Sequence, residues 1–292
     1  MKEKVMKARF WNAERIYQIF LYTVIILMSL ICLYPLIYVI SASLMSAAEW
    51  QERAGVFLFP HRPTFEAYAA VLRQPALYRA FGVSVARTVV VSLLSVCTCA
   101  VTGYALSRKD LFGRKFLSVL LFITMIYGGG LIPSYLVIEA TGLLNTFWVY
   151  VLPALMGAWS ALVFRQTFQG MPSEIEESAM VDGATELQVL VRILIPINMP
   201  TVAVMLLFAA VGQWNSWFDA MMYVDSNNVS LIPLQLYLQN AFSARPDPGK
   251  PLLNAETQKM AIAVIGILPI LCIYPFFQKY FTKGVYVGAV KG

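Results

Sequence analysis

Long apolar runs alternate with short polar segments along most of the chain. A helix that crosses a bilayer needs roughly 20 mostly apolar residues, because the hydrocarbon core is about 30 Å thick. Six runs meet this length, and they cover about residues 16–43, 84–107, 116–138, 145–168, 200–224 and 260–281. The pattern predicts an all-α polytopic membrane protein with six transmembrane helices, built as a single domain over residues 1–292.

The composition supports the same class of protein. Only 13% of the residues are charged and 59% are hydrophobic, with a mean hydropathy of +0.67. A soluble domain carries about 25% charged residues, so this chain lacks the charge that a water-facing surface requires. A disordered chain, a disulfide-rich secreted domain and a conventional soluble enzyme are all excluded.

The excess of basic residues predicts the orientation of the helices. The chain has 22 Lys and Arg against 16 Asp and Glu, and basic residues gather before residue 16, at 108–115 and near the C-terminus. With six spans these segments fall on one side, which the positive-inside rule assigns to the cytoplasm, together with both termini. We find no basic stripe with interleaved aromatic residues, so nucleic acid is not an expected partner.

Few residues could carry catalysis or bind a metal. The chain has one histidine, His61, and its four cysteines lie in apolar runs without metal-ligand or redox spacing. The cysteines are expected to be small core or lipid-facing residues. We therefore predict no catalytic residue and no metal site.

One polar stretch, Met171–Pro196, differs chemically from its apolar flanks, and we call it the elbow. Pro172 and Ser173 suit a helix start, and the following glutamates place negative charge where the helix dipole favours it. Those glutamates are Glu174, Glu176 and Glu177.

The second half of the elbow predicts a turn and a second helix. Asp182 and Gly183 should end the first helix, since glycine tolerates the positive φ of a sharp reversal. A second amphipathic run, Leu187–Ile195, is expected to end at Pro196. The sequence thus predicts a cytoplasmic helix–turn–helix with a partly apolar face, suited to docking a soluble partner. The alternative is an amphipathic connector that lies at the membrane interface.

The spacing within the elbow resembles a known signature. Glu177-Ser178-Ala179, three residues, Gly183, nine residues, Ile193, one residue and Ile195-Pro196 resemble the Glu-Ala-Ala motif of ABC importer permeases. This chain departs from the motif only by Ser178 for alanine and Ile195 for leucine.

The resemblance extends over nearly the whole chain, to the carbohydrate-uptake branch with its malG-like permeases. It includes Tyr34-Pro35, the run Gly103–Arg108 and Ile132-Pro133. The runs Gly128–Pro133 and Gly212–Trp217 look like the ytcP/lplC-type group, whose members are associated with complex or acidic oligosaccharides such as those from pectin and alginate.

The resemblance implies a MetI-like permease core in a bacterial cytoplasmic (inner) membrane. Such a subunit pairs with a second homologous permease, two ATP-binding cassette subunits and an extracytoplasmic solute-binding protein, and it carries an oligosaccharide past membrane lipid. The elbow would seat in the ATPase, and the tail 283–292 would also touch it. The implied coupling residues are Glu174, Glu177, Ala179, Asp182, Gly183, Ala184 and Pro196.

ATP is expected to be hydrolysed by another chain. We find no Gly-x4-Gly-Lys-Ser/Thr loop in this sequence, and such a loop is what cradles nucleotide phosphates. We therefore expect this subunit to be no enzyme and to bind no cofactor, with ATP and Mg²⁺ held by the partner ATPase.

The fifth run contains the best candidates for a sugar path. Sugars present apolar faces and many hydroxyls, so aromatic rings beside amides and carboxylates suit them. Trp214, Asn215, Trp217 and Asp219 form such a cluster, although aromatic belts also gather at membrane interfaces. Arg87 could attract an acidic sugar, but snorkelling to the interface is the commoner role of such an arginine.

The third run carries a second set of candidates. The run Gly128–Pro133 contains three glycines and a proline, which predict a broken or kinked helix that exposes backbone groups to the path. Tyr127 and Tyr135 are expected to lie beside this break. For the glycines themselves close helix packing is the preferred interpretation, while Tyr127 and Tyr135 are expected to border the path.

Two other classes of membrane protein have different sequence patterns. An ion-coupled secondary carrier of sugars would show midplane carboxylates and inverted repeats, and an intramembrane enzyme would cluster histidines or acids within its spans. We find none of these patterns.

Overall fold

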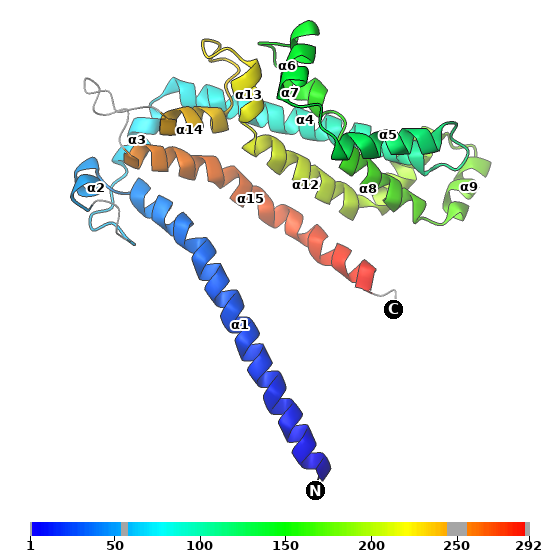
Figure 1. The fold of residues 1–292 in the computed structure, drawn as a ribbon, viewed down its shortest axis with the longest axis horizontal. Coiled ribbons are helices and arrows are strands. Elements are labelled where there is room, and N and C mark those ends of the chain that lie inside the picture. The colour runs from blue at the N-terminus through cyan, green and yellow to red at the C-terminus, as the bar shows by residue number, and fades with distance from the viewer. Residues whose placement is uncertain (1, 54–57, 244–255, 290–292) are drawn as a thin grey trace. The chain divides into compact units, whose positions relative to one another are not determined.

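The computed structural model describes residues 2–53, 58–243 and 256–289, and these form helices without any strand (Figure 1). The helices are α1 (Lys2–Ser43), α2 (Ala47–Arg53), α3 (Glu66–Leu72), α4 (Pro75–Ser107), α5 (Arg114–Ile126), α6 (Leu131–Ala140), α7 (Trp148–Val151), η1 (Leu152–Ala154), α8 (Ala158–Gln169), α9 (Ser173–Val181), α10 (Glu186–Val189), η2 (Leu190–Leu194), α11 (Ile195–Ile197), α12 (Met199–Asn215), α13 (Phe218–Tyr223), α14 (Leu234–Ser243) and α15 (Glu256–Ala289).

The helices group into two compact units. One comprises residues 1–73 and 244–265, and the other comprises residues 74–243 and 266–292. Helix α15 runs from the first unit into the second, so the single domain expected over residues 1–292 stays a prediction.

Three helices are long and apolar enough to cross a membrane as single rods. They are Glu14–Ser43, Pro75–Ser107 and Glu256–Ile273, and the count in the described part of the chain rises to six if each bent helix pair is one span. The upper count equals the number of predicted runs, although the fifth span in this count joins Glu186–Ile197 to Met199–Asn215 at 87° instead of covering 200–224. The second helix begins at Pro75, nine residues before the predicted start, since proline suits a first turn.

The third and fourth predicted spans are bent. Helices α5 and α6 meet at 116°, which confirms the break predicted at the glycines, and Gly130 has a φ of +88°. Within the described part of the chain, close packing at the glycines is wrong, because a Cβ at Gly128 or Gly129 would have no atom within 4 Å. The fourth span bends by 45° between Trp148–Ala154 and Ala158–Gln169. The backbone groups that this second bend frees need new partners, because lipid offers none.

Two side chains of α4 supply those partners. Thr98 Oγ1 donates to the Leu155 carbonyl, and Cys99 Sγ lies 3.4 Å from the Gly157 amide nitrogen, within hydrogen-bond reach. Cys99 is buried, whereas the other three cysteines are exposed, and all four are free thiols. The bend is therefore stabilised by its neighbour rather than left unsatisfied.

The second unit is organised around α4, which packs along both α8 and α12 (Figure 1). Gly103 permits the close contact with α8. A Cβ at this position would lie 2.5 Å from the Phe164 Cβ and 2.9 Å from the Ala161 carbonyl oxygen. Small residues allow helices to approach in this way inside membranes. This contact brings the ends of α4 and α8 together beneath the elbow.

The first unit carries α1, whose apolar membrane-spanning window contains no buried residue. Its last turn is anchored by the segment that follows, since Ser41 Oγ donates to the Leu58 carbonyl at 2.6 Å. The Ser43 and Tyr68 hydroxyls also share a hydrogen bond of 2.7 Å.

Candidate functional site: the elbow and the broken fifth span

The first helix of the elbow is α9, and its sequence explains both of its ends. It begins after Pro172, with Glu174 and Glu176 in the first turn, where the helix dipole favours acidic residues. It ends at Asp182, followed by Gly183 with a φ of +85°. The Ala184 amide then donates back to the Ala179 carbonyl at 2.9 Å, which closes the turn. The predicted reversal at Asp182 and Gly183 is confirmed.

The second helix of the elbow starts with a capping box. The Gln188 amide donates to Thr185 Oγ1 at 3.3 Å, and the Thr185 amide donates to Gln188 Oε1 at 2.9 Å. The prediction that this helix ends at Pro196 is wrong. A wider π turn, Leu190–Leu194, precedes the proline, and the helix continues to Ile197 because Pro196 falls in the first turn of α11, where a missing N–H costs nothing.

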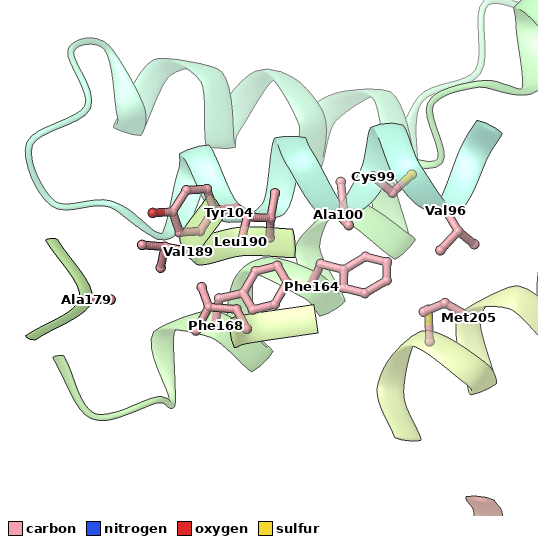
Figure 2. Close-up of a cluster of buried hydrophobic side chains, with 12 residues drawn as sticks. Val96, Cys99, Ala100, Tyr104, Phe164, Phe168, Ala179, Val189, Leu190 and Met205 are labelled. Atoms are coloured by element: carbon pink, nitrogen blue, oxygen red, sulfur yellow. The ribbon is translucent and has the colours of Figure 1, made fainter. Parts of the chain in front are cut away.

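Apolar side chains fasten the elbow to α4 and α8. Ala179, Val189, Leu190 and Leu194 from the elbow pack with Tyr104, Phe164 and Phe168 in one buried cluster (Figure 2). Val189 and Leu194 are completely buried. Of the predicted coupling residues, Ala179 and Ala184 face this cluster, so they position the elbow instead of forming its outer surface.

A salt-bridge network closes the same junction from the side. Arg108, which follows α4, places Nη1 2.6 Å from Glu176 Oε2 and Nη2 4.0 Å from Glu186 Oε1. Burial opposes the charge of Arg108, but the hydrogen bond with Glu176 and the nearby carboxylate of Asp110 raise the pKa of the guanidinium above its usual value. A hollow of about 680 Å³ opens beside this network and is lined by Glu177 among others.

The outer face of the elbow combines acidic and apolar side chains. Glu174, Glu177, Asp182 and Pro196 are exposed. Val181 is 87% exposed and Leu187 is 64% exposed, so the elbow presents large apolar side chains beside its acidic ones. Neither Val181 nor Leu187 is among the predicted coupling residues, although the amphipathic spacing of the elbow could have indicated them.

The second candidate region is a break in the fifth span. Helix α12 ends at Asn215 and α13 begins at Phe218, with Ser216 and Trp217 between them. The sequence predicts one continuous span over 200–224, so this break is a correction. Ser216 has extended backbone angles, which is incompatible with a continuing helix.

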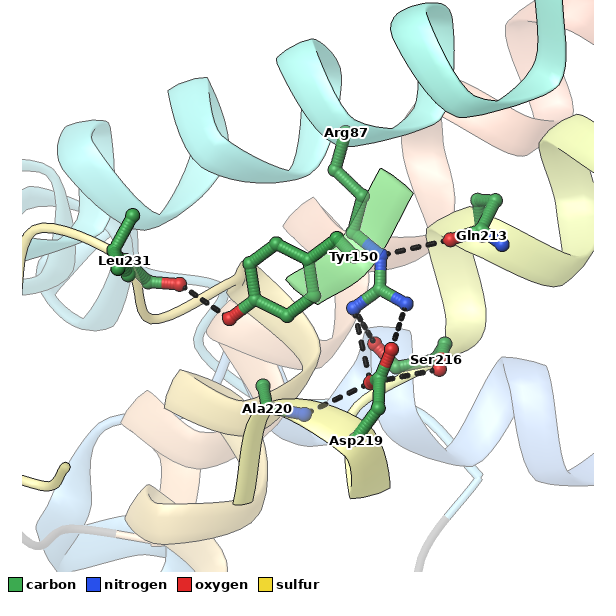
Figure 3. Close-up of polar contacts among 7 residues, drawn as sticks. All are labelled: Arg87, Tyr150, Gln213, Ser216, Asp219, Ala220 and Leu231. Atoms are coloured by element: carbon green, nitrogen blue, oxygen red, sulfur yellow. Dashed lines mark hydrogen bonds and ion pairs between the residues drawn. The ribbon is translucent and has the colours of Figure 1, made fainter. Parts of the chain in front are cut away.

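A buried arginine lies against this break (Figure 3). Arg87 of α4 donates from Nε to Gln213 Oε1 at 2.9 Å, from Nη1 to the Ser216 carbonyl at 3.4 Å, and from both Nη atoms to the Asp219 carboxylate. Its Cζ lies 4.4 Å from the centre of the Tyr150 ring. The arginine is 1% exposed, so the interpretation that it snorkels to the interface is wrong.

The carboxylate of Asp219 is held by more than the arginine. Oδ1 also accepts from Ser216 Oγ at 3.0 Å and from the Ala220 amide at 2.9 Å. The Asp219 side chain remains 28% exposed, while its partner is almost completely enclosed. Asp219 was predictable as a polar residue of the path, but the network that joins it to Arg87, Gln213 and Ser216 was not, because these residues lie far away in sequence or carry no charge.

The other predicted path residues of the fifth span differ in exposure. Trp214 is 5% exposed, its Nε1 donates to the Gly266 carbonyl at 2.9 Å, and its ring meets Phe81 edge to face. Its indole thus packs inside the chain. Asn215 is exposed and Trp217 is half-buried, so both border the break from the accessible side.

The two tyrosines predicted for the third span lie on either side of its bend. Tyr127 follows α5 directly and is 77% exposed. Tyr135, in α6, stacks on Tyr223 of α13 with ring centres 6.1 Å apart. The stacked pair connects the broken third span to the broken fifth span.

The described residues contain no group of three or more His, Cys, Asp or Glu that could hold a metal ion. The tail expected to touch an ATPase, 283–292, ends in residues outside the described part of the chain.

Comparison with known proteins places the chain among transport components. The family model described as "Binding-protein-dependent transport system inner membrane component" matches residues 111–286. Protein LplC of Bacillus subtilis is 37% identical over 269 residues, which cover 90% of each chain. The polygalacturonan/rhamnogalacturonan transport system permease protein YtcP of the same organism is 33% identical, over 96% of this chain and 99% of that protein.

A solved structure agrees with these sequence relatives. A chain from a bacterial ABC transporter involved in the import of the acidic polysaccharide alginate is 31% identical and superimposes with a TM-score of 0.84. The match covers 92% of this chain and 98% of that one.

Proposed function

The chain belongs to the family of binding-protein-dependent transport system inner membrane components, and we propose that it is the permease subunit of an ATP-driven importer of oligosaccharides. In this role it forms half of the translocation pathway, and a second, homologous permease forms the other half. Two ATP-binding cassette subunits bind and hydrolyse ATP with Mg²⁺, so this chain itself is not an enzyme. A solute-binding protein delivers the sugar.

The observation that carries this proposal is the outer face of the elbow. A helix–turn–helix that is packed on the core by one face, yet presents Val181 and Leu187 beside exposed acidic residues on the other, is built to dock a partner. The partner in such a transporter is the ATPase subunit. Because the elbow is fixed to the ends of α4 and α8, movement of the ATPase would be passed to the spans that border the pathway.

The elbow also sets the proposed orientation. It must face the cytoplasm to meet an ATPase, and with six spans this places both termini on the same side, as the distribution of Lys and Arg predicts. The sugar then enters from the opposite side, and the break in the fifth span lies towards that side in the proposed topology.

Relatives support an acidic or complex substrate. The name of YtcP specifies polygalacturonan and rhamnogalacturonan, and the similar structure comes from an alginate importer. Asn215, Trp217 and Asp219 at the break offer an amide, an indole and a carboxylate, which suit sugar hydroxyls and ring faces. Tyr127 and Tyr135, at the bend between α5 and α6, complete the proposed path. Trp214 is buried next to the break in the fifth span and helps to position the residues of the path.

The test is co-purification of the permease with its ATPase subunit, followed by ATP-dependent uptake in proteoliposomes. We expect Glu177→Arg to weaken association with the ATPase subunit at least about tenfold, and we expect the same of the double variant Val181→Asp/Leu187→Asp. A tenfold change in the dissociation constant corresponds to about 1.4 kcal/mol. Glu139→Gln, on exposed α6, is the matched control and should leave association unchanged. Unchanged association and uptake in both elbow variants would overturn the assignment.

A further inference from the structure

The strongest unexplained feature of the molecule is the charge of Arg87 inside a segment that spans the membrane. A guanidinium does not lose its proton in proteins, so its burial requires a compensating anion. Asp219 supplies that anion through two hydrogen bonds from the two Nη atoms, the geometry in which arginine and carboxylate bind most strongly (Figure 3).

The position of the pair is as informative as its chemistry. Gln213 precedes the break, Ser216 lies in it and Asp219 follows it, and Arg87 contacts all three. The Ser216 carbonyl, which no longer has a helical partner, is among the atoms that Arg87 satisfies. Both halves of the fifth span are therefore aligned by one side chain from α4.

The exposure of the pair is uneven. The arginine is enclosed at 1% exposure, while the carboxylate is 28% exposed beside Asn215 and Trp217. Asp219 Oδ1 already accepts three hydrogen bonds, whereas Oδ2 accepts one in the described structure. A carboxylate has about four acceptor sites in all, so Oδ2, the oxygen with fewer donors, is the one that a further donor would approach.

We propose that Arg87 is a positioning and specificity residue for transport: it holds the break in the fifth span and presents Asp219 as a charge-balanced acceptor for a sugar hydroxyl. This inference rests on the proposed function. The guanidinium cancels the charge of the carboxylate, so an acidic oligosaccharide meets a hydrogen-bond acceptor without the repulsion of an unpaired anion. Without Arg87, Asp219 would disfavour acidic sugars more than neutral ones.

The test uses the assembled transporter in proteoliposomes with its binding protein. The variants are Arg87→Lys, which keeps the charge but loses the fork, and Arg87→Gln/Asp219→Asn, which replaces the pair with neutral side chains of similar shape. The control is Arg53→Gln/Glu49→Gln, which removes a salt bridge on α2 whose side chains are 26% and 12% exposed. Uptake of oligogalacturonate and of a neutral arabino-oligosaccharide of equal length, the ATPase rate and thermal unfolding are measured.

We expect Arg87→Lys to raise the KM for the transported sugar about tenfold, because an ammonium cannot bind Gln213, Ser216 and Asp219 together. The neutral double variant should unfold within a few degrees of the wild type and still show a raised KM, which a purely structural pair would not cause. The control pair should leave KM and kcat unchanged.

The inference is overturned if Arg87→Lys transports with the wild-type KM and kcat, or if the double variant does so. Should the double variant fail to assemble, Arg87→Lys alone decides the matter. If the wild-type transporter takes up neither sugar, the proposed function fails, and this inference fails with it. If the wild type transports normally and the variants match it, the inference alone fails.

Discussion

Two salt-bridged arginines in this chain lie in very different surroundings. Arg108 at the elbow is 25% exposed, and its partner Glu176 is 14% exposed. Arg87 at the broken fifth span is 1% exposed, with a carboxylate that is 28% exposed. Arg108 joins the end of α4 to α9, and Arg87 joins the middle of α4 to α13. Both pairs use hydrogen bonds between a guanidinium and a carboxylate.

The difference between them lies in what would remain if a pair were broken. Water can reach Arg108, and the apolar cluster with Leu194 and Phe168 would still fasten the elbow to the core. Arg87 has no such access, so the loss of Asp219 would leave a charge in surroundings of low dielectric constant. Removing one partner of a similar pair should therefore cost little at the elbow and much at the break.

The largest effect is expected from Asp219→Asn, which strands the buried charge of Arg87. We expect a loss of about 3–5 kcal/mol in the free energy of unfolding, the usual cost of removing one partner of a buried pair. Arg87→Gln/Asp219→Asn should recover most of that loss. Unfolding in mixed detergent micelles measures both, and a double variant as unstable as Asp219→Asn would contradict this account of the break.

A second prediction tests whether packing or charge holds the elbow. Leu194 is fully buried in the cluster with α4 and α8, so Leu194→Ala should cost about 3 kcal/mol through lost contacts and a cavity. The same unfolding measurement serves here. Leu187→Ala, on the exposed face, is the control and should change stability by less than about 0.5 kcal/mol. Equal effects at the two leucines would mean that the elbow is not anchored by this cluster.

These two regions also show how far sequence alone could go. The elbow is a local structure, and its glutamates, Gly183 and apolar spacing predict two helices and the turn between them correctly. Its end at Pro196 was misplaced because a π turn, which has no clear sequence signal, lets the helix continue to Ile197. Arg108 was visible as a basic residue, but its pairing with Glu176 depends on how α4 and α9 pack.

The broken fifth span was harder to predict. Hydropathy gives one continuous run, because the break at Ser216 and Trp217 keeps an apolar composition on both sides. Arg87 and Asp219 are 132 positions apart, so no local pattern connects them, and an arginine near the end of a run is usually a snorkelling residue. By contrast, the three glycines before Pro133 correctly predicted the bend in the third span.

The smallest effect is expected from Arg108→Gln, and it is the sharpest test of the comparison. A pair that water reaches contributes about 1 kcal/mol or less, and salt screens part of that contribution. We therefore expect stability to fall by less than about 1 kcal/mol in low salt, with a smaller difference at about 1 M salt, where the Debye length is near 3 Å. Asp219→Asn leaves an enclosed charge, so its loss of stability should be nearly the same at both salt concentrations.

If Arg108→Gln proves as costly as Asp219→Asn and equally insensitive to salt, the two arginines do not differ in the way their burial implies. A small effect on stability with a large loss of ATPase-coupled uptake would instead place Arg108 in the transmission of movement from the elbow to α4, because its contact with Glu176 joins the two elements directly.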